Sequence, residues 1–501
     1  MRVGVRPTVR DPQAPRGAGS KPVGTLARPR ATAKPTPRWR TPLLLVGSDI
    51  FALLAAALAA IVLGQGQAAM PVPPAARLLW LLPLLPGIFL LMGLYPAAGV
   101  GPVEEMRRLF VSITAFSLAL ALVLVSSVPP VSPTMYGGIV TFWLLAVVGV
   151  PAGRGLVRHL FARAPWWGRP AIVLGAGKTS ELLISRLADH PGLDLKIVGC
   201  LDDDERKIGT SVLGVPVSGA IRDAPALKER LAADYAIVAM PGISPARLSE
   251  IVTWLGTVFE NVLVIPNAFG MTSIGTSTRD AGGVVGIHVH GHLSRRRNRI
   301  AKRLFDLVML VPISLVALPV VAVSALAVFV ISPGNPFFAQ VREGHRGRPI
   351  RIWKLRTMKS DAEDLLEEHL KTHPDAKAEW ESHFKLTHDP RVLPVVGSFL
   401  RRTSIDEFPQ LFNVLVGELS LVGPRPFPYY HLESFDDGFR SLRSSVRPGL
   451  TGYWQVTSRS TADLVAQVEL DSYYIKNWSL WLDLYIVART PWAVLFGPGA
   501  Y

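Results

Sequence analysis

Residues 304–331 read LFDLVMLVPISLVALPVVAVSALAVFVI, an apolar run interrupted by Asp306 and by two prolines. A straight helix of about 28 residues is about 42 Å long, more than the roughly 30 Å of hydrocarbon that it would have to cross. Proline removes a backbone donor and kinks a helix. The flanking segments, a basic stretch at 295–303 and the polar remainder at 340–501, suit the cytoplasm. The run therefore predicts a re-entrant membrane helix that enters, breaks near Pro319 and returns.

Four further apolar runs precede this segment, each near the roughly 20 residues that span a bilayer. They predict a four-helix transmembrane bundle within 41–153, with spans at 43–64, 78–95, 109–128 and 135–152. Residues 1–40 carry ten Lys or Arg and a single acid, which predicts a disordered basic tail. That tail, the loop at 97–108 and the stretch after residue 153 are basic, whereas the alternate loops carry one charge. By the positive-inside rule, the N-terminus and everything after residue 153 face the cytoplasm.

Composition narrows the class of protein and its partners. The chain has 501 residues, enough for two or three folded units, and 49% of them are hydrophobic, which indicates a membrane protein. The formal charge of +15 fits nucleic acid, anionic lipid or a phosphorylated substrate as partner. A linker at 271–303 ends in the basic stretch and leads directly into the apolar run, so we expect inner-membrane lipid and no nucleic acid. Cys200 is the single cysteine, which excludes an internal disulfide and favours a reducing cytosol.

Residues 168–270 alternate short β-branched runs with helical stretches, which predicts a Rossmann-like α/β domain with a mainly parallel sheet. The runs are AIVLG at 171–175, LKIVGC at 195–200, YAIVAM at 235–240 and NVLVIP at 261–266. The first turn, Gly175-Ala-Gly177-Lys-Thr-Ser180, resembles a dinucleotide fingerprint whose third glycine is serine, and Asp202 follows the second run. A working NAD site and a retained fold without a cofactor both remain open.

The segment 397–426 reads GSFLRRTSIDEFPQLFNVLVGELSLVGPRP and concentrates groups that handle phosphate. Asp406 and Glu407 are adjacent carboxylates, Arg401 precedes them, and Arg425 follows between two prolines. Guanidinium groups match phosphate oxygens, and carboxylates bind Mg²⁺ or act as nucleophiles. Taken alone, the acids also fit the first turn of a helix that Ser404 caps. The surrounding motifs decide between these interpretations.

Two further strings accompany this segment: Lys354-Leu-Arg356-Thr-Met before it and Arg447-Pro-Gly-Leu-Thr-Gly452 after it. In this order and spacing, residues 302–501 resemble the monotopic phosphoglycosyl transferases, also called polyprenyl sugar-phosphate transferases.

The resemblance implies a C-terminal monotopic catalytic domain at 332–501, on the cytoplasmic face of a bacterial inner membrane, and it supports the re-entrant helix. The four spans and the Rossmann-like domain ahead of it are similar to the large branch of the family. One departure is Leu318-Pro319, where the family often has Ser-Pro. The proline kink is kept, but a hydroxyl that could satisfy the freed carbonyls is missing.

The resemblance also implies a role for each polar group. Asp406 matches the family's nucleophile, which attacks the β-phosphorus of a UDP-sugar, forms a phospho-sugar aspartate and releases UMP. Glu407 would hold Mg²⁺ together with Asp406, since Mg²⁺ prefers hard oxygens from one or two carboxylates and from phosphates. The candidates for binding diphosphate or lipid phosphate are Arg401, Arg425 and Arg447, with Lys354 and Arg356 as weaker candidates.

We therefore expect an enzyme that transfers a hexose 1-phosphate, galactose or glucose, from a UDP-hexose to undecaprenyl phosphate. That reaction starts the assembly of an exopolysaccharide, capsule or O-antigen. The ending Asn477-Trp-Ser-Leu-Trp481-Leu-Asp483 and the terminal Gly-Ala-Tyr501 are similar to hexose 1-phosphate transferases and tilt the expectation slightly towards galactose. The four-span bundle could hold a homodimer together, although no motif shows it.

Three alternatives stay open. An N-acetylated or diamino sugar could replace the hexose. A membrane nucleotide-sugar dehydratase also places a Rossmann domain after four spans, but it needs a Tyr-x-x-x-Lys pair. Residues 168–292 contain one tyrosine, Tyr235, and position 239 is alanine. A non-catalytic scaffold for polysaccharide assembly is the third alternative, and the retained Asp406-Glu407 pair argues against it.

Overall fold

The computed structural model describes residues 39–65, 81–95, 98–127, 133–189, 191–265, 276–280, 285–289, 293, 296–359, 361–373, 375, 386, 389–432, 435–457 and 464–496. Nearly all of the predicted basic tail and the terminal Gly-Ala-Tyr501 lie outside these residues. The chain divides into two compact units. The first holds Met1–Gly101 and Arg108–Ala268, and the second holds Pro102–Arg107 and Phe269–Tyr501. Each unit is described by itself.

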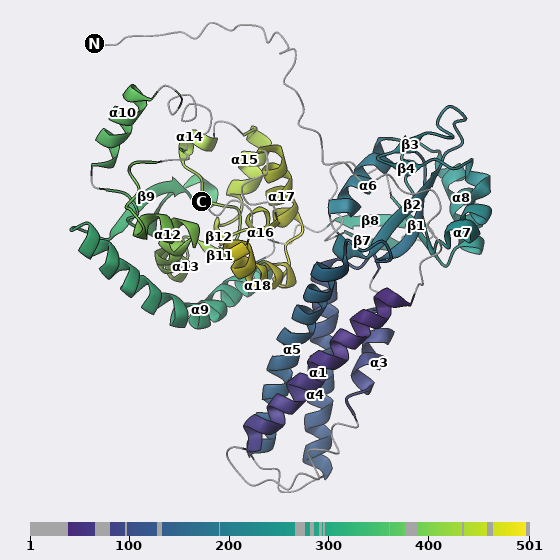
Figure 1. The fold of residues 1–501 in the computed structure, drawn as a ribbon, viewed down its shortest axis with the longest axis horizontal. Coiled ribbons are helices and arrows are strands. Elements are labelled where there is room, and N and C mark those ends of the chain that lie inside the picture. Colours follow the sequence, from purple (N-terminus) through teal and green to yellow (C-terminus); the bar gives the residue numbers. More distant parts are fainter. Residues whose placement is uncertain are drawn as a thin grey trace, which may run out of the picture. The chain divides into compact units, whose positions relative to one another are not determined.

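Among its described residues, the helical part of the first unit contains α1 (Arg40–Gln65), α3 (Leu84–Leu91), α5 (Pro133–Phe161) and, from Arg108 on, α4 (Pro102–Ser127) (Figure 1). Helix α1 packs along α5, and small residues let the two backbones approach closely. A Cβ added at Gly153 of α5 would lie 2.7 Å from the Ser48 hydroxyl of α1. Four described helices are long and apolar enough to cross a membrane: α1, α4, α5 and, in the second unit, α9.

The second predicted span, at 78–95, is not a full-length helix where the structure describes it. Residues 78–80 lie outside the described part, and α3 comprises eight residues. Pro83 and Pro86 explain the late start, because each lacks an N–H and its ring crowds the preceding turn. The helix ends just before Gly93, which has a φ of 68°. Its Leu85 and Phe89 are nevertheless fully buried in the core of the bundle.

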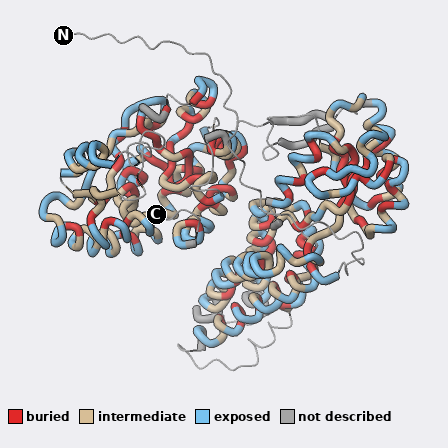
Figure 2. Tube along the Cα trace, turned by 45° about the horizontal axis from the view of Figure 1, so that its top comes forward, coloured by how far each residue is buried: buried red, intermediate tan, exposed pale blue. Residues whose placement is uncertain are grey.

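The α/β domain has the predicted parallel sheet. Its strand order is β2-β1-β5-β6, with β1 at Arg169–Leu174, β2 at Leu195–Leu201, β5 at Tyr235–Val238 and β6 at Asn261–Val264. The helices are α6 (Lys178–Asp189), α7 (Ala224–Leu231) and α8 (Pro245–Val258), and a small hairpin pairs β3 (Ser211–Val212) with β4 (Val215–Pro216). Figure 2 shows buried residues gathered in the centre of this domain. Cys200 is fully buried in β2, and burial raises the pKa of its thiol to about 12, as expected of inert packing.

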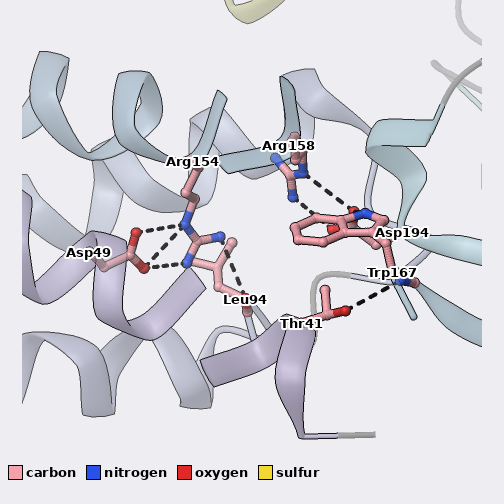
Figure 3. A network of polar contacts seen from close by, with 8 residues as sticks. Thr41, Asp49, Leu94, Arg154, Arg158, Trp167 and Asp194 are labelled. Atoms are coloured by element: carbon pink, nitrogen blue, oxygen red, sulfur yellow. Dashed lines mark hydrogen bonds and ion pairs between the residues drawn. The ribbon is translucent and has the colours of Figure 1, made fainter. Parts of the chain in front are cut away.

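A line of polar contacts ties α5 both to α1 and to the α/β domain (Figure 3). Arg154 donates hydrogen bonds to Asp49, with 2.9 Å between Nε and Oδ1 and 2.6 Å between the second guanidinium nitrogen and Oδ2. One turn further along α5, Arg158 pairs with Asp194 at 2.9 Å, and the Trp167 indole donates to the same carboxylate. Because Asp194 directly precedes β2, these contacts fix the α/β domain to the end of the bundle.

The second unit contains the long helix α9 (Arg296–Ile331) and the segments that follow it. These are β9 (Phe337–Glu343), β10 (Pro349–Leu355), α10 (Ala362–Thr372), α12 (Val396–Arg402), the 3₁₀ segment η5 (Ile405–Gln410), α13 (Leu411–Val416), β11 (Ser420–Val422), α14 (Tyr429–Leu432), α15 (Asp437–Ser444), β12 (Gly449–Thr451), α16 (Tyr453–Thr457), α17 (Leu464–Lys476) and α18 (Leu480–Phe496). Within the predicted linker, β7 (Thr276–Asp280) pairs antiparallel with β8 (Val285–Val289). The basic stretch is helical from Arg296 and forms the first turns of α9.

Helix α9 is continuous through Pro319, where the sequence predicts a break. It bends instead, as Figure 1 shows. A proline removes one backbone hydrogen bond and bends the helix, but the helix continues on both sides of it. Both halves of α9 pack against the segments that follow it in the second unit. Near its start, buried Asp306 accepts a hydrogen bond of 2.8 Å from the Ser420 hydroxyl at β11. Near its end, Val328 is fully buried in a cluster with Leu355, Leu393 and Leu400.

Candidate active site

A two-stranded hairpin positions the first cation of the site. Strands β9 and β10 are antiparallel, and Lys354 lies in β10. The free edge of β10 is held by Asn413 of α13. Its side-chain oxygen accepts from the Trp353 amide at 3.2 Å, and its amide nitrogen donates to the Arg351 carbonyl at 2.7 Å. This side chain bonds as a neighbouring strand would, and so holds the carboxylate segment, which directly precedes α13, against Lys354.

The two carboxylates lie on the short 3₁₀ segment η5 between α12 and α13. Ser404 occupies the position before this segment, but its backbone is left-handed, with a φ of 55°, and its side chain makes no capping hydrogen bond. The acids do lie in the first turn of a short helical segment, but the predicted cap by the Ser404 side chain is wrong. Pro409 lies within the segment, and the Gln410 and Leu411 that follow it are buried.

Glu407 pairs with two cations, Lys354 and Arg425. Lys354 Nζ and a terminal guanidinium nitrogen of Arg425 each lie 2.8 Å from the same oxygen, Glu407 Oε1. Lys354 Nζ is 3.9 Å from Asp406 Oδ2. The carboxylate side chains are mostly buried, at 13% exposed for Asp406 and 16% for Glu407. Charge–charge interactions are strong in such a site because little water screens them.

These surroundings push the acidities of the two carboxyls apart. Burial, followed by the negative charge of Glu407, raises the pKa of Asp406, although Lys354, Arg401 and Arg425 oppose this. Burial also acts to raise the pKa of Glu407, but Arg425 and Lys354 outweigh it and lower that pKa. Glu407 is therefore held ionised, whereas the carboxylate of Asp406 is the more basic of the two. Two coupled acids with separated pKa values are a common basis for dividing roles in catalysis.

Arg401 lies on α12, on the side of the pair that faces Thr357. Its Nε donates to the buried Thr357 hydroxyl at 2.9 Å. Burial lowers the pKa of Arg401, whereas the negative charges of Asp389 and Asp406 act to raise it. The structure thus brings Lys354, Arg401 and Arg425 to the two acids.

Two other predicted phosphate ligands lie in different surroundings. Arg356 donates to the Ser332 carbonyl just after α9 and lies against Gly334. Arg447 is exposed, and its pKa is lowered by burial of part of its side chain and by the positive charge of Arg303 near the start of α9. Their roles in binding phosphate stay predictions.

Glycines lock the two loops that follow the acids together. A Cβ added at Gly449 would lie 2.0 Å from the Gly423 nitrogen, so the backbones of the two loops touch. The Gly423 amide donates to the Thr451 carbonyl, and the Gly449 amide donates to the Pro424 carbonyl, both at 2.9 Å. Side chains cannot be accommodated at this contact, which explains the glycine just before the Pro-Arg-Pro string at 424–426 and the glycine within the Arg-Pro-Gly string at 447–449.

Polar groups of the fingerprint turn in the α/β domain are hydrogen-bonded to side chains of the same domain. Asp202 accepts a hydrogen bond of 2.6 Å from the Ala176 amide and pairs with Lys207 at 2.9 Å. The hydroxyl of Ser180, which replaces the third glycine, donates to the Gly175 carbonyl. In a dinucleotide site the amides of this turn receive phosphate. Here one of them is already satisfied by the carboxylate.

Sequence patterns did not reveal three residues that support the site: Asn413, Thr357 and Arg443. The signal for Asn413 is a buried polar residue inside the apolar stretch LFNVLV. Arg443, which is 4% exposed, shares the buried face of α15 with Phe439. A buried polar residue in an otherwise apolar pattern is the sign to look for.

The donor set for a metal is small. Within the described residues, no group of three or more His, Cys, Asp or Glu side chains could hold a metal ion. Asp406 and Glu407 supply carboxylate oxygens, the ligand type that Mg²⁺ prefers, but one Glu407 oxygen is occupied by two cations. The pair therefore fits Mg²⁺ that also takes oxygens from a bound diphosphate, and does not provide a complete protein cage.

Comparison with known proteins adds the relatives of the chain. A family model described as bacterial sugar transferase matches residues 297–497, and one described as CoA-binding domain matches residues 91–266. The UDP-galactose-lipid carrier transferase of Erwinia amylovora is 32% identical over 405 residues, covering 79% of this chain and 82% of the relative. The undecaprenyl-phosphate galactose phosphotransferase of Salmonella typhimurium is 33% identical, covering 72% and 75%. The exopolysaccharide production protein ExoY of Sinorhizobium fredii is 41% identical over 203 residues, which are 40% of this chain and 88% of that protein.

Proposed function

This chain belongs to the bacterial sugar transferase family, and on that basis we propose that it transfers a hexose 1-phosphate from UDP-galactose or UDP-glucose to undecaprenyl phosphate. UMP is released, and the hexosyl diphosphate lipid begins an exopolysaccharide, capsule or O-antigen. Two of the relatives named above carry galactose in their names, and the undecaprenyl-phosphate transferase of Escherichia coli, 31% identical over 341 residues, carries glucose.

The observation that carries this proposal is the asymmetry of the two acids. Glu407 is neutralised by Lys354 and Arg425 at 2.8 Å, whereas Asp406 lies 3.9 Å from Lys354 Nζ and has the higher pKa. A more basic carboxylate is the better nucleophile, provided that it is ionised at the working pH. Asp406 therefore suits nucleophilic attack, and Glu407 suits the alignment of cations.

Two displacements follow at phosphorus. An Asp406 oxygen attacks the β-phosphorus of the UDP-sugar, the bond from that phosphorus to the bridging oxygen breaks, and UMP leaves. An oxygen of undecaprenyl phosphate then attacks the same phosphorus and releases the Asp406 carboxylate, which restores the enzyme. No proton transfer is needed to balance either step. Lys354, Arg401 and Arg425 spread the negative charge that accumulates when anionic groups meet.

Mg²⁺ held between Asp406, Glu407 and the diphosphate would neutralise further charge and orient the phosphate oxygens. The cations of the chain orient the diphosphate from the protein side, and the two interlocked glycine loops hold Arg425 in place.

The proposed site works at the cytoplasmic face of a bacterial inner membrane, where the lipid acceptor, undecaprenyl phosphate, is embedded. Exposed apolar side chains cover the helices beside η5 and the C-terminal helix: Phe399, Phe412, Leu415, Val416, Trp492 and Leu495, all more than half exposed. Such side chains on amphipathic helices suit the lipid interface. Both halves of α9 pack against this same domain, which favours a re-entrant helix whose ends stay on one side.

The test is UMP release by the detergent-solubilised full chain with Mg²⁺, undecaprenyl phosphate and either UDP-galactose or UDP-glucose. We expect lipid-dependent release that is lost in Asp406→Asn, by at least about 10³-fold. Failure with both donors, followed by release in a panel of N-acetylated and diamino donors, would replace the hexose. Failure with every donor would favour the assembly scaffold.

A further inference from the structure

The loop that carries Arg425 is held from behind by a side chain that the proposed chemistry does not use. Arg443 of α15 donates a hydrogen bond from its guanidinium to the carbonyl oxygen of Arg425. Its Cζ also lies 4.2 Å from the centroid of the Phe427 ring. Arg443 therefore contacts the loop on both sides of Pro426.

The same loop directs its own charged side chain towards the acids. Arg425 reaches Glu407 at 2.8 Å, while its backbone carbonyl receives Arg443. One residue of the loop is thus fixed at two points, by its side chain in front and by its backbone behind. Phe427 adds a third anchor, because it is packed among Leu432, Phe435 and Phe439.

A buried acid, Asp471, interacts with Arg443 through charge. Asp471 of α17 is 1% exposed, and neither of its carboxylate oxygens has a hydrogen-bond partner. The second terminal nitrogen of Arg443 is likewise buried without such a partner. Burial lowers the pKa of Arg443, and the charges of Asp471 and of Glu343 in β9 oppose that. Burial raises the pKa of Asp471 to about 7, and the positive charge of Arg443 opposes that rise. In its ionised form Asp471 stabilises the buried guanidinium through charge, while the hydrogen bond of Arg443 goes to the Arg425 carbonyl.

We propose that Arg443 is a positioning residue that fixes the Arg425 loop, with Asp471 as its counter-charge. Its effect on rate rests on the proposed function, because Arg425 is then the group that neutralises Glu407 and the substrate phosphate. Its effect on the position of the loop does not depend on the proposed function. Small misplacements of a catalytic cation cost large factors in rate, so the loop must be held as well as charged.

The first experiment is a mutant cycle in kcat/KM for UMP release by the full chain. Arg425→Ala and Arg443→Met are each expected to lower it by about 10- to 100-fold. The double variant is expected to be no slower than Arg425→Ala, because nothing remains for Arg443 to position. Arg440→Met is the matched control, since Arg440 lies on the same helix, is 43% exposed and pairs weakly with Asp437. Losses that multiply in the double variant would overturn the inference.

The second experiment does not depend on activity. Hydrogen exchange of peptides covering 421–428 is measured in the folded full chain for wild type, Arg443→Met and Arg440→Met. Faster exchange in Arg443→Met alone is expected, and unchanged exchange would overturn the inference whatever the enzyme does. A wild type that releases no UMP would count against the proposed function only. Arg443→Lys replaces the methionine variant in both experiments if the latter does not fold, with intermediate effects expected because an amine still donates to the carbonyl.

Discussion

Asp406 and Glu407 are neighbours in the chain, yet their surroundings give them different acidities. Burial and the charge of Glu407 raise the pKa of Asp406 to about 6, and Lys354 counteracts part of that rise. A carboxylic acid with a raised pKa takes up a proton at a higher pH than usual. As the pH falls through about 6, Asp406 becomes neutral and loses the nucleophilic form that the proposed mechanism requires.

Lys354→Met is the residue-scale prediction. Removing this cation raises the pKa of Asp406 further, so the acid limb of the kcat/KM profile should move to higher pH, and the maximal rate should fall by about tenfold or more. UMP release is measured from about pH 5 to about pH 9. The lipid phosphate titrates identically for both proteins, so a difference between profiles reports the enzyme. Lys371→Met, at an exposed ion pair on α10, is the control, and an unshifted limb would contradict the assignment.

At the scale of elements, the site depends on how α13 and β10 are joined. The Asn413 side chain is 1% exposed and makes the two strand-like hydrogen bonds that hold the carboxylate segment beside Lys354. Its second amide hydrogen goes to Glu418 at 2.7 Å. Asn413 therefore fixes the distance between segments far apart in the chain.

Asn413→Leu should lower the free energy of unfolding by about 2 kcal/mol, because the partly buried Trp353 amide and the Arg351 carbonyl of β10 lose their partner. Thermal unfolding in detergent measures this loss, and UMP release should fall with it. Asn413→Asp separates the two bonds, since it keeps the acceptor for Trp353 but places a second carboxylate beside Glu418. A leucine variant with wild-type stability would show that the contact with β10 is not needed.

At the scale of the whole molecule, the chain consists of two units with separate cores, and the candidate site lies wholly in the second. The sugar transferase match begins at residue 297, and the Sinorhizobium fredii relative aligns over 88% of its length with 40% of this chain. We therefore expect a protein that begins at residue 290 to keep lipid-dependent UMP release, with its Asp406→Asn variant as the control. A folded but inactive truncation would show that the first unit takes part in catalysis.

The first unit contains a buried ion pair between Asp49 and Arg154, whose side chains are 0% and 1% exposed (Figure 3). Arg154→Met leaves a buried carboxylate without its counter-charge and should destabilise this unit by about 3–5 kcal/mol. Limited proteolysis of the α/β domain in detergent measures the loss. The double variant Asp49→Asn/Arg154→Met should recover part of it, because no unpaired charge remains. Equal sensitivity of the single and double variants would rule out the unpaired charge as the cause.

The sequence by itself determined the four parallel strands, the long apolar helices and the acids that lie next to each other in the chain. These features are written in contiguous residues, as hydrophobic period, β-branched runs and motif strings. Only the tertiary structure decided which cations reach the acids, and these are Lys354, Arg401 and Arg425. Arg356 instead contacts the residue that follows the end of α9, and Arg447 interacts with Arg303 near the start of α9. The tertiary structure also replaced the predicted break at Pro319 by a bend and shortened the second span to α3. The reason is physical. The direction of a long side chain, and the tolerance of a helix for proline, depend on what distant segments pack against it, and that packing is not encoded in any local pattern.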